Sequence, residues 1–429
     1  MGDSRLGIVF AGKAPHGDPL EQPDNLSSVQ GPMSPPLNER TSRRSVAKGG
    51  VAAGAGSALG NSRVLAGDAS ADASRRVTTD ERSPITRKFR RIAVEEAFSL
   101  PEVAKEMQKI ARGPGESLDL PLIRGIYDGA PGYDNLNFLE RLLDIEDRRL
   151  KEMDKFGVDM HVLSLTAPGV QMFDAERACE LATLANDGLA EVISRHPTRF
   201  AGLASFAPQA PKRAVKEMER AISGLKLNGF IVNSHTNNEY FDDPKYWSIL
   251  EAAEALDGCI YIHPRAPSDG LKGPLRAYAL DAATWGYGVE VGTHAVRMMV
   301  SGVFDRFPKL KICLGHMGEA VHFWIWRVTF MNNRAQRSGR APKTQLTMEE
   351  YFQRNFVIAT SGVEDPLALD YSIKKIGVDN VMWAIDYPYQ PTQPAVEFMD
   401  AAPLSDGDKA KVYHRNAKRV FHIAAQQDD

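Results

Sequence analysis

Short apolar runs alternate with longer amphipathic segments from Phe89 onward in this 429-residue chain, and this alternation restricts the possible folds. Eight runs have the length and apolar character of buried strands: Ile92–Phe98, Val158–Leu165, Phe200–Phe206, Gly229–Asn233, Cys259–His263, Leu310–Gly315, Phe356–Thr360 and Val381–Asp386. Strands that alternate with helices favour a parallel sheet, and eight such units favour a closed (β/α)8 barrel. An open doubly wound sheet is the alternative, but no glycine-rich GxGxxG sequence follows an early run.

Helical patterns and insertions fill the segments between these runs. The helical patterns are Phe138–Phe156, Ala175–His196, Ala210–Leu225, Pro244–Leu256, Glu290–Phe304, Ala320–Arg337, Pro366–Ile376 and Asp406–Phe421. Two segments are predicted insertions: Leu100–Asn137 after the first strand and Arg265–Tyr287 after the fifth. Both follow the carboxyl end of a strand, where a barrel builds its active-site face and its lids.

Residues 1–88 differ from residues 89–429, which we assign to the barrel domain. The first segment is rich in Gly, Pro, Ala and Ser and poor in aromatics, so we expect it to be disordered. Between about 41 and 71, the pair Arg43-Arg44 precedes a weakly apolar stretch and the small-residue pattern Ala69-Ser70-Ala71. This order resembles a twin-arginine signal and predicts a periplasmic or exported protein. A basic tail on a cytoplasmic protein is the alternative.

Composition gives little indication of a macromolecular partner. The net charge of −3 does not suggest a general affinity for nucleic acid or acidic membranes. No uninterrupted apolar run is long enough to span a bilayer. The three cysteines lie far apart without CxxC spacing, and Cys259 and Cys313 fall inside apolar runs, so we expect buried thiols rather than disulfides.

Four of the predicted strands end in ionisable residues. Glu95, His263, His316 and Asp386 each close or follow an apolar run. Because the carboxyl ends of barrel strands converge on one face, these residues are expected to share a pocket. One histidine and two carboxylates, Glu95, His263 and Asp386, form a plausible three-ligand metal site with open positions.

Each of these residues also has a purely structural explanation. A histidine after a strand is commonly a hydrogen-bonding residue, and Asp386 before Tyr-Pro has the context of a turn former. Glu95 is harder to dismiss, since a buried carboxylate needs a partner. The arrival of all four at one predicted rim favours the metal site.

Several longer motifs resemble the decarboxylase branch of the amidohydrolase superfamily, in particular 2,3-dihydroxybenzoate, γ-resorcylate and 5-carboxyvanillate decarboxylases. Aminocarboxymuconate semialdehyde decarboxylase resembles the chain more distantly. The motifs are IAVEEAFSLPE from Ile92, LSLTAPGVQ from Leu163, GFIVNS from Gly229, YIHPR from Tyr261, GVFDRFPKLKICLGHMGE from Gly302, AIDYP from Ala384 and RNAKRVF from Arg415. The resemblance runs from about Arg91 to His422.

The resemblance implies one divalent metal ion, Mn, Zn or Mg, held by Glu95, His263 and Asp386. Many relatives have a histidine two residues after the first-strand glutamate, where this chain has Ala97. The 2,3-dihydroxybenzoate enzymes resemble this chain in having alanine there. Binuclear relatives carry a carboxylated lysine where this chain has Asn233 and Ser234, so a single ion is expected.

The resemblance also assigns roles beyond the metal ligands. His316 matches a histidine that acts near the metal, and Glu319 matches the carboxylate that orients it. Asn233 and Arg327 are the candidates for substrate binding. Arg327 lies where relatives place an arginine that binds the substrate carboxylate, sometimes from a neighbouring subunit. An ordinary arginine on a helix surface is the alternative.

The implied function is non-oxidative decarboxylation of a hydroxybenzoate-type aromatic acid. Asp386 is the expected proton donor to the ring, with His316 and Glu319 at the phenol. The expected partners are a small aromatic carboxylic acid and further copies of the chain, as a dimer or tetramer. A metal-dependent hydrolase of lactones or amides is the first alternative, and an exported binding protein without catalysis is the second.

Overall fold

The computed structural model describes residues 88–130 and 136–424. The predicted export signal at about 41–71 lies outside the described residues. The described residues fall within one compact unit, Glu81–Asp429. Among them, no helix combines the length and apolar character needed to cross a bilayer.

The centre of this unit is a parallel sheet whose strands follow one another in chain order. Neighbouring strands pair in parallel from β1 to β3 and from β4 to β9. The short β3 and β4 form one interrupted strand, since the N–H of Leu203 between them still donates to Leu163 O at 2.8 Å. The strands are β1 (Ile92–Phe98), β2 (Met160–Leu165), β3 (Phe200–Gly202), β4 (Ala204–Ser205), β5 (Phe230–Asn233), β6 (Ile260–His263), β7 (Ile312–Leu314), β8 (Phe356–Ala359) and β9 (Val381–Met382).

The sheet closes into a barrel between β1 and the segment after β9. Val94 N donates to Trp383 O at 3.2 Å, and Ala97 N donates to Tyr387 O at 2.7 Å. A parallel bridge also joins Glu96 and Tyr387. These contacts connect the first strand to the last, so the predicted (β/α)8 barrel is confirmed.

Two apolar layers explain the strand sequences. Ile92 and Val94 pack inside the barrel with Met160, Tyr261 and Cys313. Ala93, between them in sequence, belongs to the layer between strands and helices. Strands buried on both faces read as nearly continuous apolar runs, which is why all eight were recognisable.

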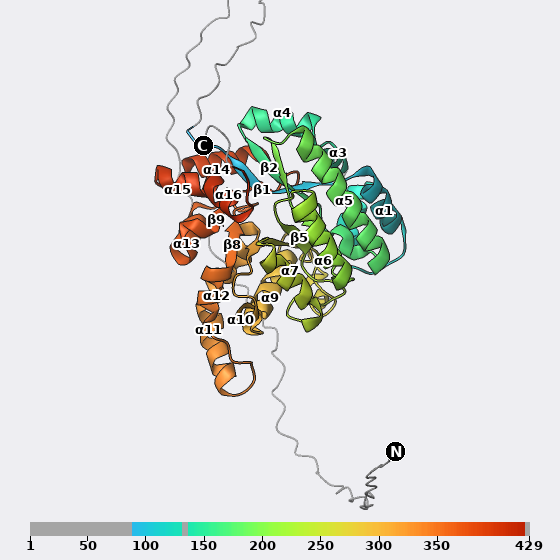
Figure 1. Ribbon diagram of the computed structural model, residues 1–429. Helices are drawn as coiled ribbons and strands as arrows, with labels where there is room; N and C mark the ends of the chain where they lie inside the picture. The colour runs from blue at the N-terminus through green and yellow to red at the C-terminus, as the bar shows by residue number, and fades with distance from the viewer. Residues whose placement is uncertain (1–87, 131–135, 425–429) are drawn as a thin grey trace, which may run out of the picture. The chain divides into compact units, whose positions relative to one another are not determined.

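Helices surround the strands, and Figure 1 shows α11 and α12 extending together beyond them. The outer helices are α4 (Asp147–Phe156), α5 (Ala175–Arg195), α6 (Pro211–Glu219), α7 (Trp247–Ala255), α9 (Gly286–Val300), α10 (Val303–Arg306), α11 (Val321–Arg337), α12 (Met348–Asn355), α13 (Pro366–Ile376), α14 (Thr392–Ala401), α15 (Asp406–Ala410) and α16 (Asn416–Val420). α12 and α14 were not predicted.

Several of the predicted element boundaries differ from the structure, as three examples show. The helix predicted over Phe138–Phe156 is broken into α3 (Phe138–Leu143) and α4, because the Asp144 carboxylate accepts the N–H groups that begin α4. The helix predicted over Glu290–Phe304 is interrupted at Gly302, whose φ of +83° ends the helical path. The last strand ends at Met382 rather than at Asp386.

The two predicted insertions meet above the barrel through a buried ion pair. The first carries α1 (Pro101–Arg112) and α2 (Leu120–Asp128), and the second carries α8 (Lys272–Leu275). Arg265, just after β6, donates from Nε and Nη2 to Asp119 Oδ2. The two residues are 4% and 3% exposed, so this pair fastens the insertion after β1 to the strand that carries His263.

Candidate metal centre

Glu95, His263 and Asp386 meet at the carboxyl ends of their strands. One ligand atom from each lies within 4.8 Å of the other two. Glu95 is 3% exposed and Asp386 is 8% exposed. Two carboxylates and an imidazole at this spacing suit a divalent cation, since a cation offsets the repulsion between buried carboxylates.

A β-bulge directs Glu95 into this site. Ala93 pairs with His161 and Glu96 with Leu163, so β1 has one more residue than β2 over this stretch. Bulges commonly re-aim a side chain next to an active site. Because of the bulge, the side chains of the consecutive residues Glu95 and Glu96 lie in different surroundings.

Only one oxygen of Glu95 is occupied by protein donors. Tyr261 Oη and Ser361 Oγ both donate to Oε2, whereas the buried Oε1 has no hydrogen-bond partner. Burial alone would raise the pKa of Glu95, but the nearby His316 and His263 and these two hydrogen bonds outweigh it and lower the pKa. The carboxylate is therefore anionic and has one oxygen free for a ligand.

Hydrogen bonding selects the tautomer of His263. Its Nδ1 lies 2.7 Å from the carbonyl oxygen of Pro264. A carbonyl can only accept, so Nδ1 carries the proton and Nε2 presents a lone pair. Nε2 lies 3.3 Å from Glu95 Oε1, the same oxygen that has no protein donor. Both atoms are thus available to one cation.

His316 stands beside these three residues, held by Glu319. Its Nδ1 lies 2.8 Å from Glu319 Oε1, while its Nε2 is 3.7 Å from both Glu95 Oε1 and Asp386 Oδ2. His316 to Ala320 form an unbroken run of positive φ angles, which places His316 and Glu319 on the same side of the turn. Such backbone conformations are strained and cluster at functional sites.

The charges around His316 favour its protonated form. Burial alone would lower the pKa of His316, but Glu95, Glu319 and Asp386 together raise it well above its usual value. The pKa of Asp386 is raised by burial and by Glu95, against the opposing effect of His316 and His263. A cation at the site would shift this balance toward an anionic Asp386 and a neutral His316.

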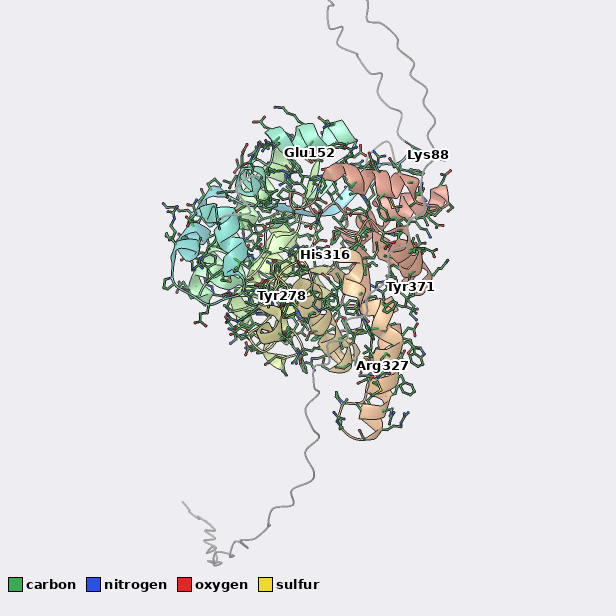
Figure 2. The ribbon with its side chains drawn as sticks, turned by 180° about the vertical axis from the view of Figure 1, so that it is seen from behind. Lys88, Glu152, Tyr278, His316, Arg327 and Tyr371 are labelled. Atoms are coloured by element: carbon green, nitrogen blue, oxygen red, sulfur yellow. The ribbon has the colours of Figure 1, made fainter. Side chains whose placement is uncertain are left out.

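The two predicted substrate-binding residues lie in different places. Asn233 ends β5 beside His263, is 3% exposed, and its Oδ1 has no hydrogen-bond partner. Gln171 holds its backbone by accepting Asn233 N at 2.7 Å and donating to Asn233 O at 2.9 Å. Arg327 lies on the exposed, projecting part of α11, away from His316 (Figure 2). A single chain therefore places Asn233 at the rim but not Arg327.

A cavity of about 690 Å³ opens beside the site. His316 and Glu319 form its polar edge, and most of its other lining is apolar, from α9 and α11. The apolar residues include Val289, Val296, Trp324, Val328 and Val363. Concave apolar surface with a few convergent polar groups is typical of sites for small organic ligands.

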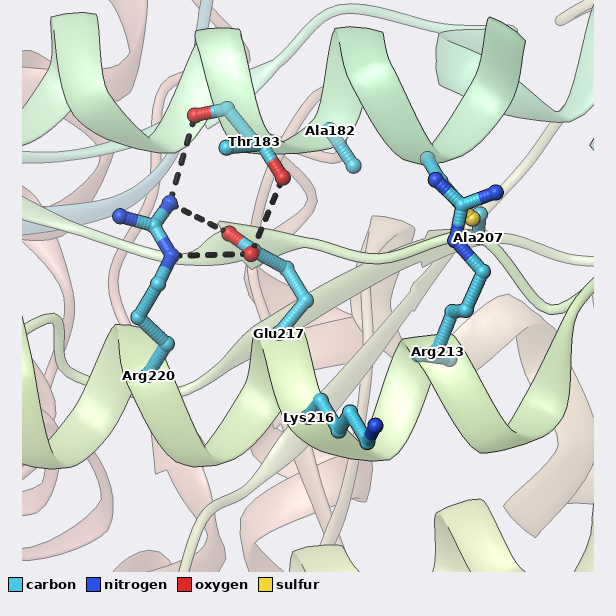
Figure 3. Close-up of a pocket in the computed structure, with 9 residues that line it drawn as sticks. Ala182, Thr183, Ala207, Arg213, Lys216, Glu217 and Arg220 are labelled. Atoms are coloured by element: carbon cyan, nitrogen blue, oxygen red, sulfur yellow. Dashed lines mark hydrogen bonds and ion pairs between the residues drawn. The ribbon is translucent and has the colours of Figure 1, made fainter. Parts of the chain in front are cut away.

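A second cavity, of about 230 Å³, lies between α5 and α6 (Figure 3). Glu217 accepts there from Arg220 and from Thr183. None of the candidate site residues lines it. The first cavity is bordered by His316 and Glu319, although none of the three candidate metal ligands lines it.

Tyr261 and Ser361, the donors to Glu95, were not anticipated from the sequence. Tyr261 precedes His263 by two positions, so strand alternation places both on one face. Its Oη could have been assigned to the site on that basis. Ser361 follows β8 by two residues and carries no comparable pattern.

Comparisons with known proteins agree with this geometry. The amidohydrolase family model matches residues 139–423. The γ-resorcylate decarboxylase of Polaromonas sp. is 37% identical over 292 residues, covering 66% of this chain and 89% of the relative. That of Rhizobium sp. is 33% identical over 344 residues, covering 78% of this chain and 98% of the relative.

Solved structures give the same grouping. The crystal structure of 5-carboxyvanillate decarboxylase from Sphingomonas paucimobilis has a TM-score of 0.76 and 52% identity, covering 78% of this chain and 100% of that chain. The corresponding protein from Novosphingobium aromaticivorans, complexed with manganese and 4-hydroxy-3-methoxy-5-nitrobenzoic acid, has a TM-score of 0.76 and 36% identity, covering 78% and 96%. This chain belongs to the amidohydrolase family, in the branch that these decarboxylases represent.

Proposed function

We propose that this protein is a metal-dependent, non-oxidative decarboxylase of a hydroxybenzoate-type aromatic acid. The observation that carries the proposal is the convergence of Glu95, His263 and Asp386 on one point. It occurs in a chain that is 52% identical over the full length of a 5-carboxyvanillate decarboxylase. The expected cofactor is one divalent ion. Manganese is favoured because three of the similar solved structures contain it and because the donor set is rich in oxygen.

The chain's own donors fit such an ion. Glu95 Oε1 has no protein partner, and His263 Nε2 has its lone pair free because Nδ1 binds Pro264 O. When bound, the ion supplies a Lewis acid that polarises the phenol and carboxylate oxygens of the substrate. Tyr261 and Ser361 hold Glu95 in place from its other oxygen.

Asp386 is the proposed proton donor. In its acid form it gives its proton to the ring carbon that bears the carboxylate, using a pair of ring π electrons. The bond between that carbon and the carboxylate then breaks, its electron pair restores the aromatic ring, and CO2 leaves. This order avoids an aryl anion. The position of Asp386 supports this role, because its carboxylate lies within the same cluster as Glu95 and His263 and 3.7 Å from His316 Nε2.

His316 and Glu319 are proposed to act on the phenol. Glu319 fixes the ring of His316 through Nδ1 at 2.8 Å, so Nε2 faces the site. Nε2 is placed to accept the phenol proton or to hydrogen-bond the phenolate. The cavity beside His316 has an apolar lining that suits the aromatic ring.

The proposed substrate is a 4-hydroxy-3-methoxybenzoate with a second carboxylate beside the hydroxyl, as in 5-carboxyvanillate. Identity to the Sphingomonas 5-carboxyvanillate decarboxylase is 52%, against 37% for a γ-resorcylate decarboxylase. A screen of 5-carboxyvanillate, 2,6-dihydroxybenzoate and 2,3-dihydroxybenzoate with manganese-loaded protein would test this by CO2 release. Acid released from lactones or amides, without CO2, would instead support the hydrolase alternative.

The role of Asp386 has a direct test. Asp386→Asn keeps an oxygen that can bind the metal but removes the acid. We expect kcat to fall by about 10²- to 10⁴-fold while the metal content is largely retained. Asp370→Asn, in an exposed pair with Lys374 on α13, is the matched control. Near-normal decarboxylation by Asp386→Asn would exclude this role.

We also propose that the protein is a homo-oligomer in which Arg327 acts on the site of a neighbouring copy. Around it, α11 exposes Phe323, Trp324, Trp326 and Phe330. Exposed aromatic clusters mark interfaces, and Trp and Arg dominate interface energetics.

Mixed oligomers would test the role of Arg327. Arg327→Ala and Asp386→Asn subunits, each inactive alone, should regain activity when co-assembled, because a hybrid then contains one intact site. A monomer by light scattering, or the absence of complementation in verified hybrids, would contradict the proposal.

Export through the twin-arginine pathway remains a proposal based on the sequence of residues 41–71. Export in the folded state would suit an enzyme that acquires its metal before translocation. Cell fractionation of the wild type and an Arg43→Lys, Arg44→Lys variant would test it. Equal distribution of the two proteins between compartments would contradict it.

A further inference from the structure

We infer that Glu96, adjacent in sequence to the candidate ligand Glu95, is a positioning residue for Asp386. The inference deepens the proposed function and rests on it for the role of Asp386. Glu96 is fully buried. Its Oε1 accepts the N–H of Ile385 at 2.9 Å, and its Oε2 accepts the N–H of Tyr387 at 3.1 Å. One carboxylate therefore holds the backbone N–H groups of the two residues that flank Asp386.

The backbone at Asp386 needs such support. Regular strand pairing ends at Met382, four residues earlier. Asp386 itself has a φ of +74°, in the left-handed region that non-glycine residues rarely adopt. Strained conformations of this kind persist only where surrounding contacts enforce them. The two hydrogen bonds to Glu96 lie directly at this strained residue.

A buried cation and a ring complete the support. The Arg149 side chain, from α4, is fully buried and donates from Nη2 to Ala97 O. Its guanidinium lies 4.5 Å from the centre of the Tyr387 ring. His161 Nδ1 is 4.0 Å from Glu96 Oε2. Arg149 thus packs against the residue that follows Asp386, and His161 borders Glu96 without a hydrogen bond to it.

The bulge in β1 determines the positions of both Glu95 and Glu96. The bulge in β1 sends Glu95 toward His263 and leaves Glu96 beneath the turn that carries Asp386. Displacement of that turn would move Asp386 relative to Glu95. Metal coordination tolerates errors of only about 0.2 Å in ligand distance, so small displacements matter.

A purely structural role is the alternative, since Glu96 also lies at the seam where the barrel closes. The two roles predict different measurements. A structural role lowers the melting temperature and the amount of folded protein. A positioning role changes the metal environment and the rate per metal-loaded site in the protein that does fold.

The test is Glu96→Gln in the full-length protein. An amide has one acceptor oxygen, so an N–H of Ile385 or Tyr387 would face an NH2 group, and the turn must shift. We expect the Kd for Mn²⁺ to rise about 10- to 100-fold, as for other groups that orient metal ligands. We also expect a changed EPR spectrum of bound Mn²⁺, and a kcat per bound metal at least about tenfold lower with KM nearly unchanged.

Glu217→Gln is the matched control. Glu217 is a nearly buried carboxylate that accepts from Asn186 at 2.7 Å and borders the cavity of Figure 3, away from the candidate site. The same chemical change there should leave the Mn²⁺ spectrum and the kcat per bound metal unchanged.

The outcomes separate the inference from the function on which it rests. Wild-type Mn²⁺ affinity, spectrum and kcat per metal in Glu96→Gln, with only a lower melting temperature, would overturn the inference. A wild-type protein that binds Mn²⁺ but releases no CO2 from any hydroxybenzoate would refute the proposed function, while the spectra still decide the role of Glu96. If Glu96→Gln does not fold, Glu96→Asp, which retracts the carboxylate by one methylene, gives the same comparison.

Discussion

Replacing Gly315 by alanine would place a new Cβ in steric conflict with the candidate metal ligand Glu95. A Cβ at Gly315 would lie 2.6 Å from Glu95 Oε2 and 2.8 Å from Oε1. Contacts of a real Cβ are essentially never shorter than 3.0 Å, so the carboxylate would have to retreat by about 0.4 Å. Tyr261 from β6 and Ser361 from the segment after β8 hold Oε2 and limit that retreat.

The displacement can be converted into an expected loss of metal affinity. A shift of about 0.4 Å is twice the tolerance of about 0.2 Å on metal–ligand distances. Changes around a metal ligand typically reduce affinity about 10- to 100-fold. For Gly315→Ala we therefore expect a free energy of Mn²⁺ binding weaker by about 1.4–2.8 kcal/mol.

The assay is a Mn²⁺ titration of metal-free protein, following free Mn²⁺ by EPR. The matched control is Gly407→Ala, in the exposed α15, where the added Cβ meets only Ser405 Oγ at 3.8 Å. Melting temperatures without metal would show how much overpacking alone destabilises the fold. A Kd for Gly315→Ala within twofold of the wild type would refute the reasoning, because it would mean that Glu95 is not a ligand or is free to move.

Two further predictions concern stability. Burial lowers the pKa of His322 to about 4. Below pH 6.5 the unfolded chain therefore takes up a proton at this residue, whereas the folded chain does not. The free energy of unfolding should fall by roughly 3 kcal/mol between pH 7 and pH 4 because of this residue. His322→Phe should flatten this dependence in urea titrations at several pH values, and an unchanged slope would contradict it. Asp119→Asn leaves the Arg265 cation buried without its carboxylate, and should lower the free energy of unfolding by about 3–5 kcal/mol; a loss below 1 kcal/mol in urea denaturation would contradict the buried pair.

The barrel and the convergence of its rim residues could be predicted because both follow from periodic features. Each strand is buried on two sides and therefore forms a continuous apolar run. An ionisable residue that terminates such a run lies at the same rim as the others, however far apart they are in sequence. That rule brought together Glu95, His263, His316 and Asp386, and the structure places them within a few ångströms of one another.

Features that depend on the contacts of a single side chain or on the register of two strands could not be predicted. The break between α3 and α4 depends on where one carboxylate, that of Asp144, finds two free N–H groups. The β-bulge at Glu95 depends on the register of β1 against β2, which no local pattern reveals. Within one chain Arg327 lies on an exposed helix, and no local sequence pattern reveals whether a neighbouring copy covers it.

The site residues are held by polar groups from several segments of the barrel. Tyr261 and Ser361 fix Glu95, the Pro264 carbonyl fixes His263, and Glu319 fixes His316. These supporting groups come from β6, from the segment after β8 and from the turn after β7. No single strand therefore defines the geometry of the site. The closure of the barrel between β1 and the segment after β9 also contributes, because Glu95 lies on β1 and Asp386 lies after β9. Changes that loosen this seam should weaken metal binding before they unfold the chain, because the metal requires tenths of an ångström whereas the apolar layers do not.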